Sequence, residues 1–173
     1  MIFLSIGSNL SSSFGDRFEN INKCISLLLS NKVKPLQVSD FYESISYPDK
    51  KNPKFINIIL MVKFNGTPKS LLSIISYIEK KMGRIRTRKN DPRIIDIDIV
   101  DYDKIIMNTE KLILPHPNLE KRNFVLFPLR EICADWHHPI TNKKIDFYIK
   151  KLNFNSSNEI TRIDESAILN NDK

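Results

Sequence analysis

Residues 93–100, Arg-Ile-Ile-Asp-Ile-Asp-Ile-Val, constrain the fold most strongly, because their alternating pattern predicts a β-strand with two distinct faces. Three isoleucines would share the face toward the core, and Asp96 and Asp98 would share the other. The Cα atoms of the two aspartates would lie about 6.5–7 Å apart, a spacing at which carboxylates can bind one or two divalent cations. A solvated sheet face is the simpler explanation for such a pair, so the neighbouring segments must decide between the two.

The segments on either side of this strand favour a site for phosphate and magnesium. Residues 83–89 before the strand are rich in arginine and lysine, and His116 follows it. His116 lies between two prolines, so it cannot sit inside a helix and must be presented by an extended segment. The adjacent His137 and His138 would face opposite ways on an extended segment, which disfavours a shared metal site for them.

The composition limits the possible functions without deciding among them. The chain has 173 residues, of which 41% are hydrophobic, and this suffices for one domain with a core. The net charge of +7 suits a nucleic acid, an anionic membrane or a polyanionic small substrate. Cys24 and Cys133 show neither a disulfide framework nor a zinc-binding spacing. With no secretion signal and no apolar run of about 20 residues, we expect a cytoplasmic protein that does not bind membranes.

The periodicity along the chain predicts the order strand, helix, strand, strand, helix, strand. The first helix would begin near Asp16, and the second at Thr67, where a proline follows in the first turn. A turn is predicted at residues 7–9, and Asp101 and Asp103 are interpreted as turn formers. The predicted strands cover residues 2–6, 33–45, 55–62, 93–100 and 105–107.

This order is that of the ferredoxin-like, or split βαβ, α+β fold. It implies an antiparallel sheet with two long helices on one face and extra C-terminal helices. One domain is expected over residues 1–152, followed by a polar C-terminal tail over residues 153–173 whose composition favours fraying and partial disorder.

Asn57 interrupts a strand that is otherwise strongly apolar. A buried asparagine must satisfy the hydrogen bonds of its amide. Its partner could be the protein backbone, which would make it structural, or the edge of a flat heterocycle, which would make it part of a binding site. The residue alone does not decide between the two.

Six short segments, in this order, resemble the 6-hydroxymethyl-7,8-dihydropterin pyrophosphokinases, the folate-biosynthesis enzymes that transfer diphosphate from ATP to a pterin alcohol. The resemblance covers roughly residues 1–152, and six ordered pieces are far more specific than any one of them. The segments are residues 6–10, 41–44, 55–57, 83–86, 92–98, and 114–116 continued by 122–124.

The resemblance implies a role for each matching residue. Asp96 and Asp98 would hold two Mg²⁺ ions on the triphosphate, and Arg84 and Arg93 would join them as catalytic residues. ATP would be bound by Glu79, Arg84, Arg86, Arg93, Lys111, His116 and Arg122. The pterin would stack between Phe55 and Phe124 and would hydrogen-bond with Asn57 and Ser44. The chain departs from the family's pattern at residues 89–92, which lack the usual Trp-Gly, and at residues 44–47, which lack the usual prolines.

Other functions are possible on the same residues. A ferredoxin-like nucleic-acid-binding module would need exposed aromatics alternating on its central strands, and the strand at residues 55–62 is mainly aliphatic. A two-metal phosphohydrolase would usually gather more carboxylates than Asp96, Asp98 and Glu79. An inactive relative would not need Arg93 and His116. We therefore expect an ATP-dependent pyrophosphokinase that acts as a monomer on small molecules and binds no nucleic acid.

Overall fold

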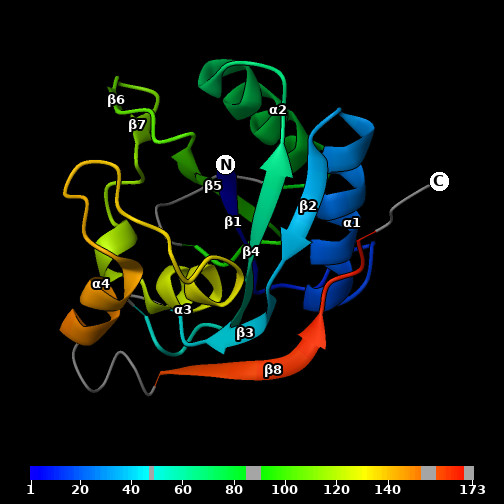
Figure 1. Cartoon of the computed structure of the whole chain (residues 1–173). Coiled ribbons are helices and arrows are strands. Elements are labelled where there is room, and N and C mark those ends of the chain that lie inside the picture. Colours follow the sequence, from blue (N-terminus) through cyan, green and yellow to red (C-terminus); the bar gives the residue numbers. More distant parts are fainter. Residues whose placement is uncertain (47–48, 85–90, 153–158, 170–173) are drawn as a thin grey trace.

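The computed structural model describes residues 1–46, 49–84, 91–152 and 159–169 (Figure 1). Within the described residues, the six strands of the main sheet, two long helices and several shorter elements follow one another along the chain. Their bounds are β1 Ile2–Ser8, α1 Arg17–Ser30, β2 Lys34–Val38, β3 Asp40–Ser44, β4 Phe55–Lys63, α2 Pro68–Lys81, β5 Asp96–Tyr102, β6 Met107–Asn108, β7 Ile113–Leu114, a 3₁₀ helix Leu119–Lys121, α3 Asn123–Ile132, α4 Ile145–Lys151 and β8 Ile160–Ser166.

The main sheet is antiparallel and has the order β5-β1-β4-β3-β8, with β2 also pairing with β4. The predicted α+β class and antiparallel sheet are confirmed. Because β1 lies between β4 and β5, residues that are far apart in the sequence become neighbours across three adjacent strands.

Two hydrophobic clusters pack on opposite faces of the sheet, as the alternation of side chains requires. Ile2, Leu4 and Ile6 of β1 belong to the cluster that also includes α1 and α2. Phe3, from the same strand, belongs to the cluster with α3 and α4. Figure 1 shows the two pairs of helices on either side of the strands.

Both long helices begin where the sequence predicts. The Asp16 side chain accepts from the backbone N–H groups of Phe18 and Glu19, and the Glu19 side chain accepts from the Asp16 backbone N–H, which forms a capping box. Thr67 caps α2 in the same manner, with Pro68 in the first turn. Within the described residues, no helix is both long and apolar enough to cross a membrane.

Three local predictions were wrong. β1 continues through Ser8, so residues 7 and 8 belong to the sheet rather than to a turn. The strand predicted over residues 33–45 is two strands separated at Ser39, whose hydroxyl accepts from the backbone N–H of Ile59 at 3.0 Å. The short strand predicted at residues 105–107 is instead β6 at Met107–Asn108.

The prediction of a fraying tail missed β8, which pairs with β3 along the edge of the sheet. β8 carries few apolar residues because most of its side chains are exposed, so its sequence gives little sign of a strand. Arg162 instead anchors it by an ion pair with Asp40 of β3 at 2.5 Å.

Asp101 was also misinterpreted as a turn former only. It lies in β5, is 2% exposed, and accepts a hydrogen bond from the indole N–H of Trp136 at 2.8 Å. It does accept from the backbone N–H of Lys104 as well, as a turn former would. A register shift where β5 pairs with β1 turns Asp101 toward the α3 side, and such a bulge cannot be read from composition.

Candidate active site

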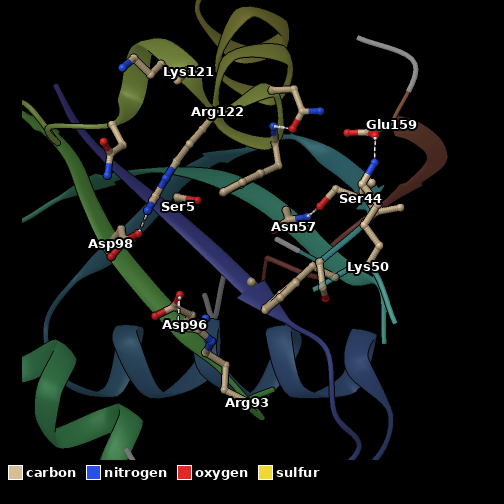
Figure 2. Close-up of a pocket in the computed structure, with 17 residues that line it drawn as sticks. Ser5, Ser44, Lys50, Asn57, Arg93, Asp96, Asp98, Lys121, Arg122 and Glu159 are labelled. Carbon is tan, nitrogen blue, oxygen red and sulfur yellow. Dashed lines mark hydrogen bonds and ion pairs between the residues drawn. The ribbon is translucent and has the colours of Figure 1, made fainter. Parts of the chain in front are cut away.

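The floor of the main cavity is a row of residues across three adjacent strands. Gly7 of β1 pairs with Asp96 of β5 on one side and with Asn57 of β4 on the other. Residues paired in this way point to the same face of a sheet. Ser5, two residues before Gly7, pairs with Asp98. Carboxylates and an amide therefore converge above small side chains in a cavity of about 570 Å³ (Figure 2).

Asp96 lies between two arginines. Its Oδ1 is 2.6 Å from Nη1 of Arg84, and its Oδ2 is 3.1 Å from Nη1 of Arg93. Arg84 is also paired with Glu79 of α2, and Glu79 accepts from the backbone N–H of Ile97 at 3.0 Å. Glu79 thus fixes Arg84 against β5, beside the carboxylate.

Arg93 carries an unsatisfied donor. Its Nε is buried and has no hydrogen-bond partner among the described residues. Its guanidinium also lies 5.6 Å from the centre of the Phe55 ring. An orphaned buried N–H is costly, so this group is suited to an anionic ligand entering the cavity.

Asp98 lies between Arg122 and His116. Arg122 donates to its Oδ2 at 2.8 Å, and Nε2 of His116 lies 3.6 Å from the same oxygen. Nδ1 of His116 accepts from the backbone N–H of Asn118, which leaves the proton of a neutral ring on Nε2, facing Asp98. Burial lowers the pKa of His116, and the nearby Asp98 carboxylate opposes this only in part.

Stability is expected to fall as the pH decreases through about 6.5, the unfolded pKa of histidine. Burial lowers the folded pKa of both His116 and His138, so the unfolded chain takes up protons first and is favoured by acid. The stability that these two histidines contribute is complete above about pH 6.5 and is lost as the pH falls toward their folded pKa values. Urea unfolding midpoints between about pH 7.5 and about pH 5.5 would measure this. His116→Gln and His138→Gln should each reduce the dependence, and a flat wild-type profile would contradict the prediction.

The other end of the cavity combines an amide with two aromatic rings. Nδ2 of Asn57 donates to the backbone oxygen of Tyr42 at 3.2 Å and to Oγ of Ser44 at 2.9 Å. Both N–H groups are thus used within the sheet, and Oδ1 accepts no hydrogen bond from the described residues. The rings of Phe55 and Phe124 line the same cavity. The structural and the binding interpretation of Asn57 are therefore compatible. The Nδ2 end of its amide is bonded within the sheet, and the Oδ1 end can accept a hydrogen bond from a ligand.

A second cavity of about 490 Å³ adjoins the first and shares Asp98 with it. Its walls are partly apolar, with Leu72 and Ile75 from α2. Its polar lining includes Glu79, Lys111 and His116. Asp98 is thus common to the linings of both cavities.

The structure thus brings together most of the residues that the sequence suggested for a site. Arg86 lies outside the described residues. The sequence analysis assigned no site role to several other residues that line the main cavity, because which side chains reach the cavity depends on strand pairing and loop position rather than on a local pattern. They are Ser5, Gly7, Lys50, Asn118, Lys121, Asn123 and Glu159. Lys50 and Glu159 form an ion pair at 2.6 Å, which brings the start of β8 to the cavity.

The donor set at Asp96 and Asp98 fits magnesium. Mg²⁺ prefers oxygen ligands and is usually held by one or two carboxylates, with substrate phosphates and water completing its shell. Within the described part of the chain, no group of three or more His, Cys, Asp or Glu side chains could hold a metal by itself. Oxygens from water or from a bound ligand would complete the shell of a metal held by Asp96 and Asp98, and the basic residues around it suit phosphate.

Comparison with known proteins agrees with this chemistry. Residues 3–134 match the family described as 7,8-dihydro-6-hydroxymethylpterin-pyrophosphokinase. The 2-amino-4-hydroxy-6-hydroxymethyldihydropteridine pyrophosphokinase of Aquifex aeolicus is 38% identical over 144 residues, which cover 83% of this chain and 87% of that protein. The folic acid synthesis protein fol1 of Pneumocystis carinii is 38% identical over 151 residues, 87% of this chain and 20% of that protein.

The chain spans about a fifth of the length of the first three curated relatives that it matches. In its fold it is similar to the wild-type HPPK-DHPS of Plasmodium falciparum solved with pteroate, with a TM-score of 0.69 and 18% identity. That match covers 96% of this chain and 47% of the other. The sequence match extends over most of the chain and includes the strands that form the cavity floor. The chain therefore belongs to the 7,8-dihydro-6-hydroxymethylpterin-pyrophosphokinase family.

Proposed function

We propose that this chain transfers diphosphate from ATP to the hydroxymethyl group of 6-hydroxymethyl-7,8-dihydropterin and releases AMP, as a step in folate biosynthesis. The observation that carries the proposal is the row Asp96, Gly7, Asn57 on the cavity floor. With strands about 4.8 Å apart, the carboxylate and the amide stand about 10 Å from one another. That separation allows a phosphate chain at one end of the cavity and a flat ring at the other.

The pterin is proposed to occupy the end lined by Asn57, Ser44, Phe55 and Phe124. A pterin has flat faces that suit aromatic rings and an edge with both donors and acceptors. Oδ1 of Asn57 would accept from this edge, because its Nδ2 is already used by Tyr42 and Ser44.

ATP is proposed to bind across both cavities. The triphosphate would lie over Asp96 and Asp98, and the adenosine would enter the cavity lined by Leu72, Ile75 and Lys111. Arg84, Arg93 and Arg122 now pair with the two carboxylates and would bind phosphate oxygens once a metal takes over those carboxylates. The buried Nε of Arg93 gives one such oxygen a partner. Arg86 is proposed to join them on the phosphates, and His116 would donate from Nε2.

Asp96 and Asp98 are proposed to hold two Mg²⁺ ions with the phosphates. Bound magnesium would neutralise charge on the phosphate oxygens and orient them for in-line displacement. The residues of the chain supply the rest by positioning and electrostatics. The hydroxymethyl oxygen of the pterin would attack the β-phosphorus of ATP and lose its proton to solvent, the bond from that phosphorus to the α,β-bridging oxygen would break, and AMP would leave with that oxygen. Arg84 and Arg93 stabilise the charge that develops on the transferred group.

The experiment is to measure AMP production from ATP with and without magnesium and with and without the pterin alcohol. AMP formation that requires both would support the proposal. ADP as the product, or ATP cleavage that is indifferent to the pterin, would contradict it. The same assay separates the phosphohydrolase, which would cleave ATP alone, from the nucleic-acid-binding module, which would not cleave it.

Gly7→Ala is expected to raise the KM for the pterin alcohol about tenfold and to change the KM for ATP little. A Cβ at this position would lie 3.0 Å from Oδ1 of Asn57 and 3.4 Å from Cδ1 of Phe55. The Asn57 amide, which belongs to the proposed pterin end, would have to shift slightly, while the Phe55 ring would remain in ordinary van der Waals contact. Steady-state kinetics with each substrate varied would measure the effect. An unchanged KM for the pterin alcohol would show that the Asn57 amide does not contact it.

We also infer that the fold is ferredoxin-like in detail. The order β5-β1-β4 with β2 and β3 beside β4 matches that fold if β2 and β3 count as one interrupted strand. The catalytic unit is proposed to be residues 1–152 acting as a monomer, since the described residues that line the two cavities, except Glu159, come from that part of one chain. Light scattering of the purified chain would test the monomer.

A further inference from the structure

Asn9, directly after β1, forms two backbone bridges to the segment before β5. The side-chain Oδ1 of Asn9 accepts from the backbone N–H of Arg93 at 2.7 Å. The backbone N–H of Asn9 donates to the backbone oxygen of Arg93 at 3.2 Å. Asn9 is 2% exposed, so solvent cannot replace these bonds readily. The position of the Arg93 backbone is therefore set from Asn9.

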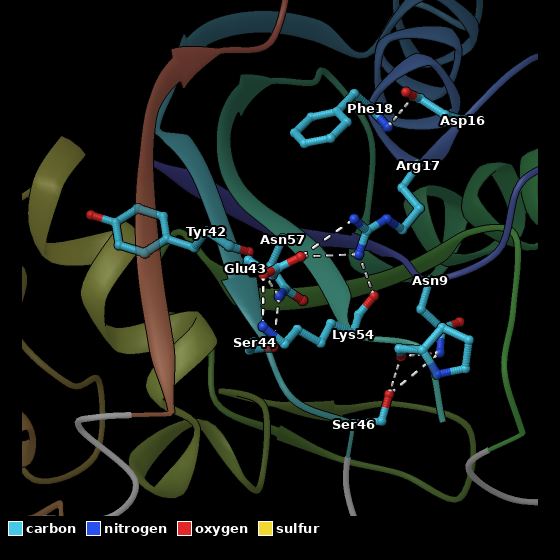
Figure 3. Close-up of polar contacts among 11 residues, drawn as sticks. Asn9, Asp16, Arg17, Phe18, Tyr42, Glu43, Ser44, Ser46, Lys54 and Asn57 are labelled. Atoms are coloured by element: carbon cyan, nitrogen blue, oxygen red, sulfur yellow. Dashed lines mark hydrogen bonds and ion pairs between the residues drawn. The ribbon is translucent and has the colours of Figure 1, made fainter. Parts of the chain in front are cut away.

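The other end of the same amide holds the loop between β3 and β4. Nδ2 of Asn9 donates to the backbone oxygen of Pro53 at 3.1 Å and lies 3.5 Å from Oγ of Ser46. Ser46 also donates to the Pro53 oxygen, so the two sides of the loop close at this point (Figure 3). Arg17 adds a further bond, from Nη1 to the backbone oxygen of Lys54 at 2.8 Å.

These two ends belong to the two halves of the proposed site. Arg93 pairs with Asp96 on the phosphate side. Ser46 lines the cavity at its other end, and Pro53 lies two residues before Phe55. Asn9 itself is absent from the cavity lining, so it does not touch the space where the substrates would bind.

We infer that Asn9 is a positioning residue that sets the phosphate half of the site relative to the pterin half. The inference rests on the proposed function. In-line transfer needs the attacking oxygen and the phosphorus about 3–3.5 Å apart and aligned, and a shift of about 1 Å can cost about 100-fold in rate. A single buried amide bonded to both halves fixes that alignment. A purely structural amide would contribute stability without affecting alignment.

The test compares three variants of the full chain by steady-state AMP formation and by thermal unfolding. Asn9→Ala is expected to raise the KM for both substrates and to lower kcat at least about tenfold, because both halves are released. Ser46→Ala, which leaves the bridges to Arg93 intact, should raise only the KM for the pterin alcohol. Ser39→Ala removes another buried hydroxyl, bonded to Ile59 at the break between β2 and β3, and should lower the Tm with all kinetic constants within about twofold.

A fourth variant separates the two ends of the amide. Asn9→Asp, assayed at about pH 8.5 to favour the ionised carboxylate, keeps the acceptor for Arg93 and loses the donor to Pro53. We expect a nearly unchanged KM for ATP and a raised KM for the pterin alcohol. If Asn9→Ala does not fold, Asn9→Asp still tests the inference.

Two outcomes would overturn the inference. One is an Asn9→Ala variant with wild-type kinetic constants and a lowered Tm, which would make the amide structural only. The other is an Asn9→Asp variant that changes both KM values equally or neither. A wild-type chain that forms no AMP would instead contradict the proposed function itself.

Discussion

Asp98→Ala is expected to lower kcat/KM for diphosphate transfer by about three orders of magnitude while leaving the fold intact. Among the residues that the structure describes, Asp98 is the one shared by the linings of the two cavities, so it lies where the triphosphate would pass from one to the other. Its removal would eliminate half of the proposed metal ligands and leave Arg122 without its carboxylate partner.

The stability of this variant should change little. The Asp98 side chain is 34% exposed, and ion pairs of this kind contribute about 0–1 kcal/mol. Loss of the repulsion between Asp98 and Asp96 offsets part of that contribution. Thermal unfolding and AMP formation at saturating magnesium would be measured together. A large drop in Tm, or activity within tenfold of the wild type, would contradict the prediction.

Asp103→Ala is the matched control. Asp103 directly follows β5 and is exposed, but its carboxylate pairs with the N-terminal amino group and is absent from both cavity linings. The activity of the Asp103→Ala variant should equal that of the wild type. A loss comparable with that of Asp98→Ala would mean that negative charge in this region acts from a distance, without a metal.

The alternating pattern at residues 93–100 predicted both faces of β5 correctly. Ile95, Ile97 and Ile99 are buried in the cluster with α1 and α2, and Asp96 and Asp98 line the cavity on the opposite face. This worked because side-chain alternation is a local property of a strand. The helix starts were equally predictable, because capping residues act within one turn.

The register between strands could not be read from the sequence. Nothing local indicates that Gly7 stands between Asp96 and Asn57, since this follows from how β1 enters the sheet between strands from distant parts of the chain. β8 was missed for a related reason. Its position depends on pairing with β3 and on the ion pair between Arg162 and Asp40, rather than on apolar periodicity.

Asn57→Ala is expected to raise the KM for the pterin alcohol about 100-fold and to leave the KM for ATP nearly unchanged. Removal of the amide takes away the acceptor Oδ1 and also frees Ser44 and the Tyr42 carbonyl, which Nδ2 now holds. A polar group of the substrate would then be buried without a partner, which explains why the effect exceeds that of an apolar contact. Stability should fall by about 1–3 kcal/mol for the same reason.

The control for that stability loss is Asn31→Ala, at the C-terminal cap of α1. Asn31 donates from Nδ2 to the backbone oxygen of Leu27 at 2.8 Å and lines neither cavity. It should lower the Tm without altering either KM. If the two variants have the same KM for the pterin alcohol and differ only in stability, Asn57 is structural, and other residues form the hydrogen bonds to the edge of the pterin. If only Asn57→Ala raises the KM for the pterin alcohol, the free end of its amide is the acceptor, and the row across β5, β1 and β4 places both substrates.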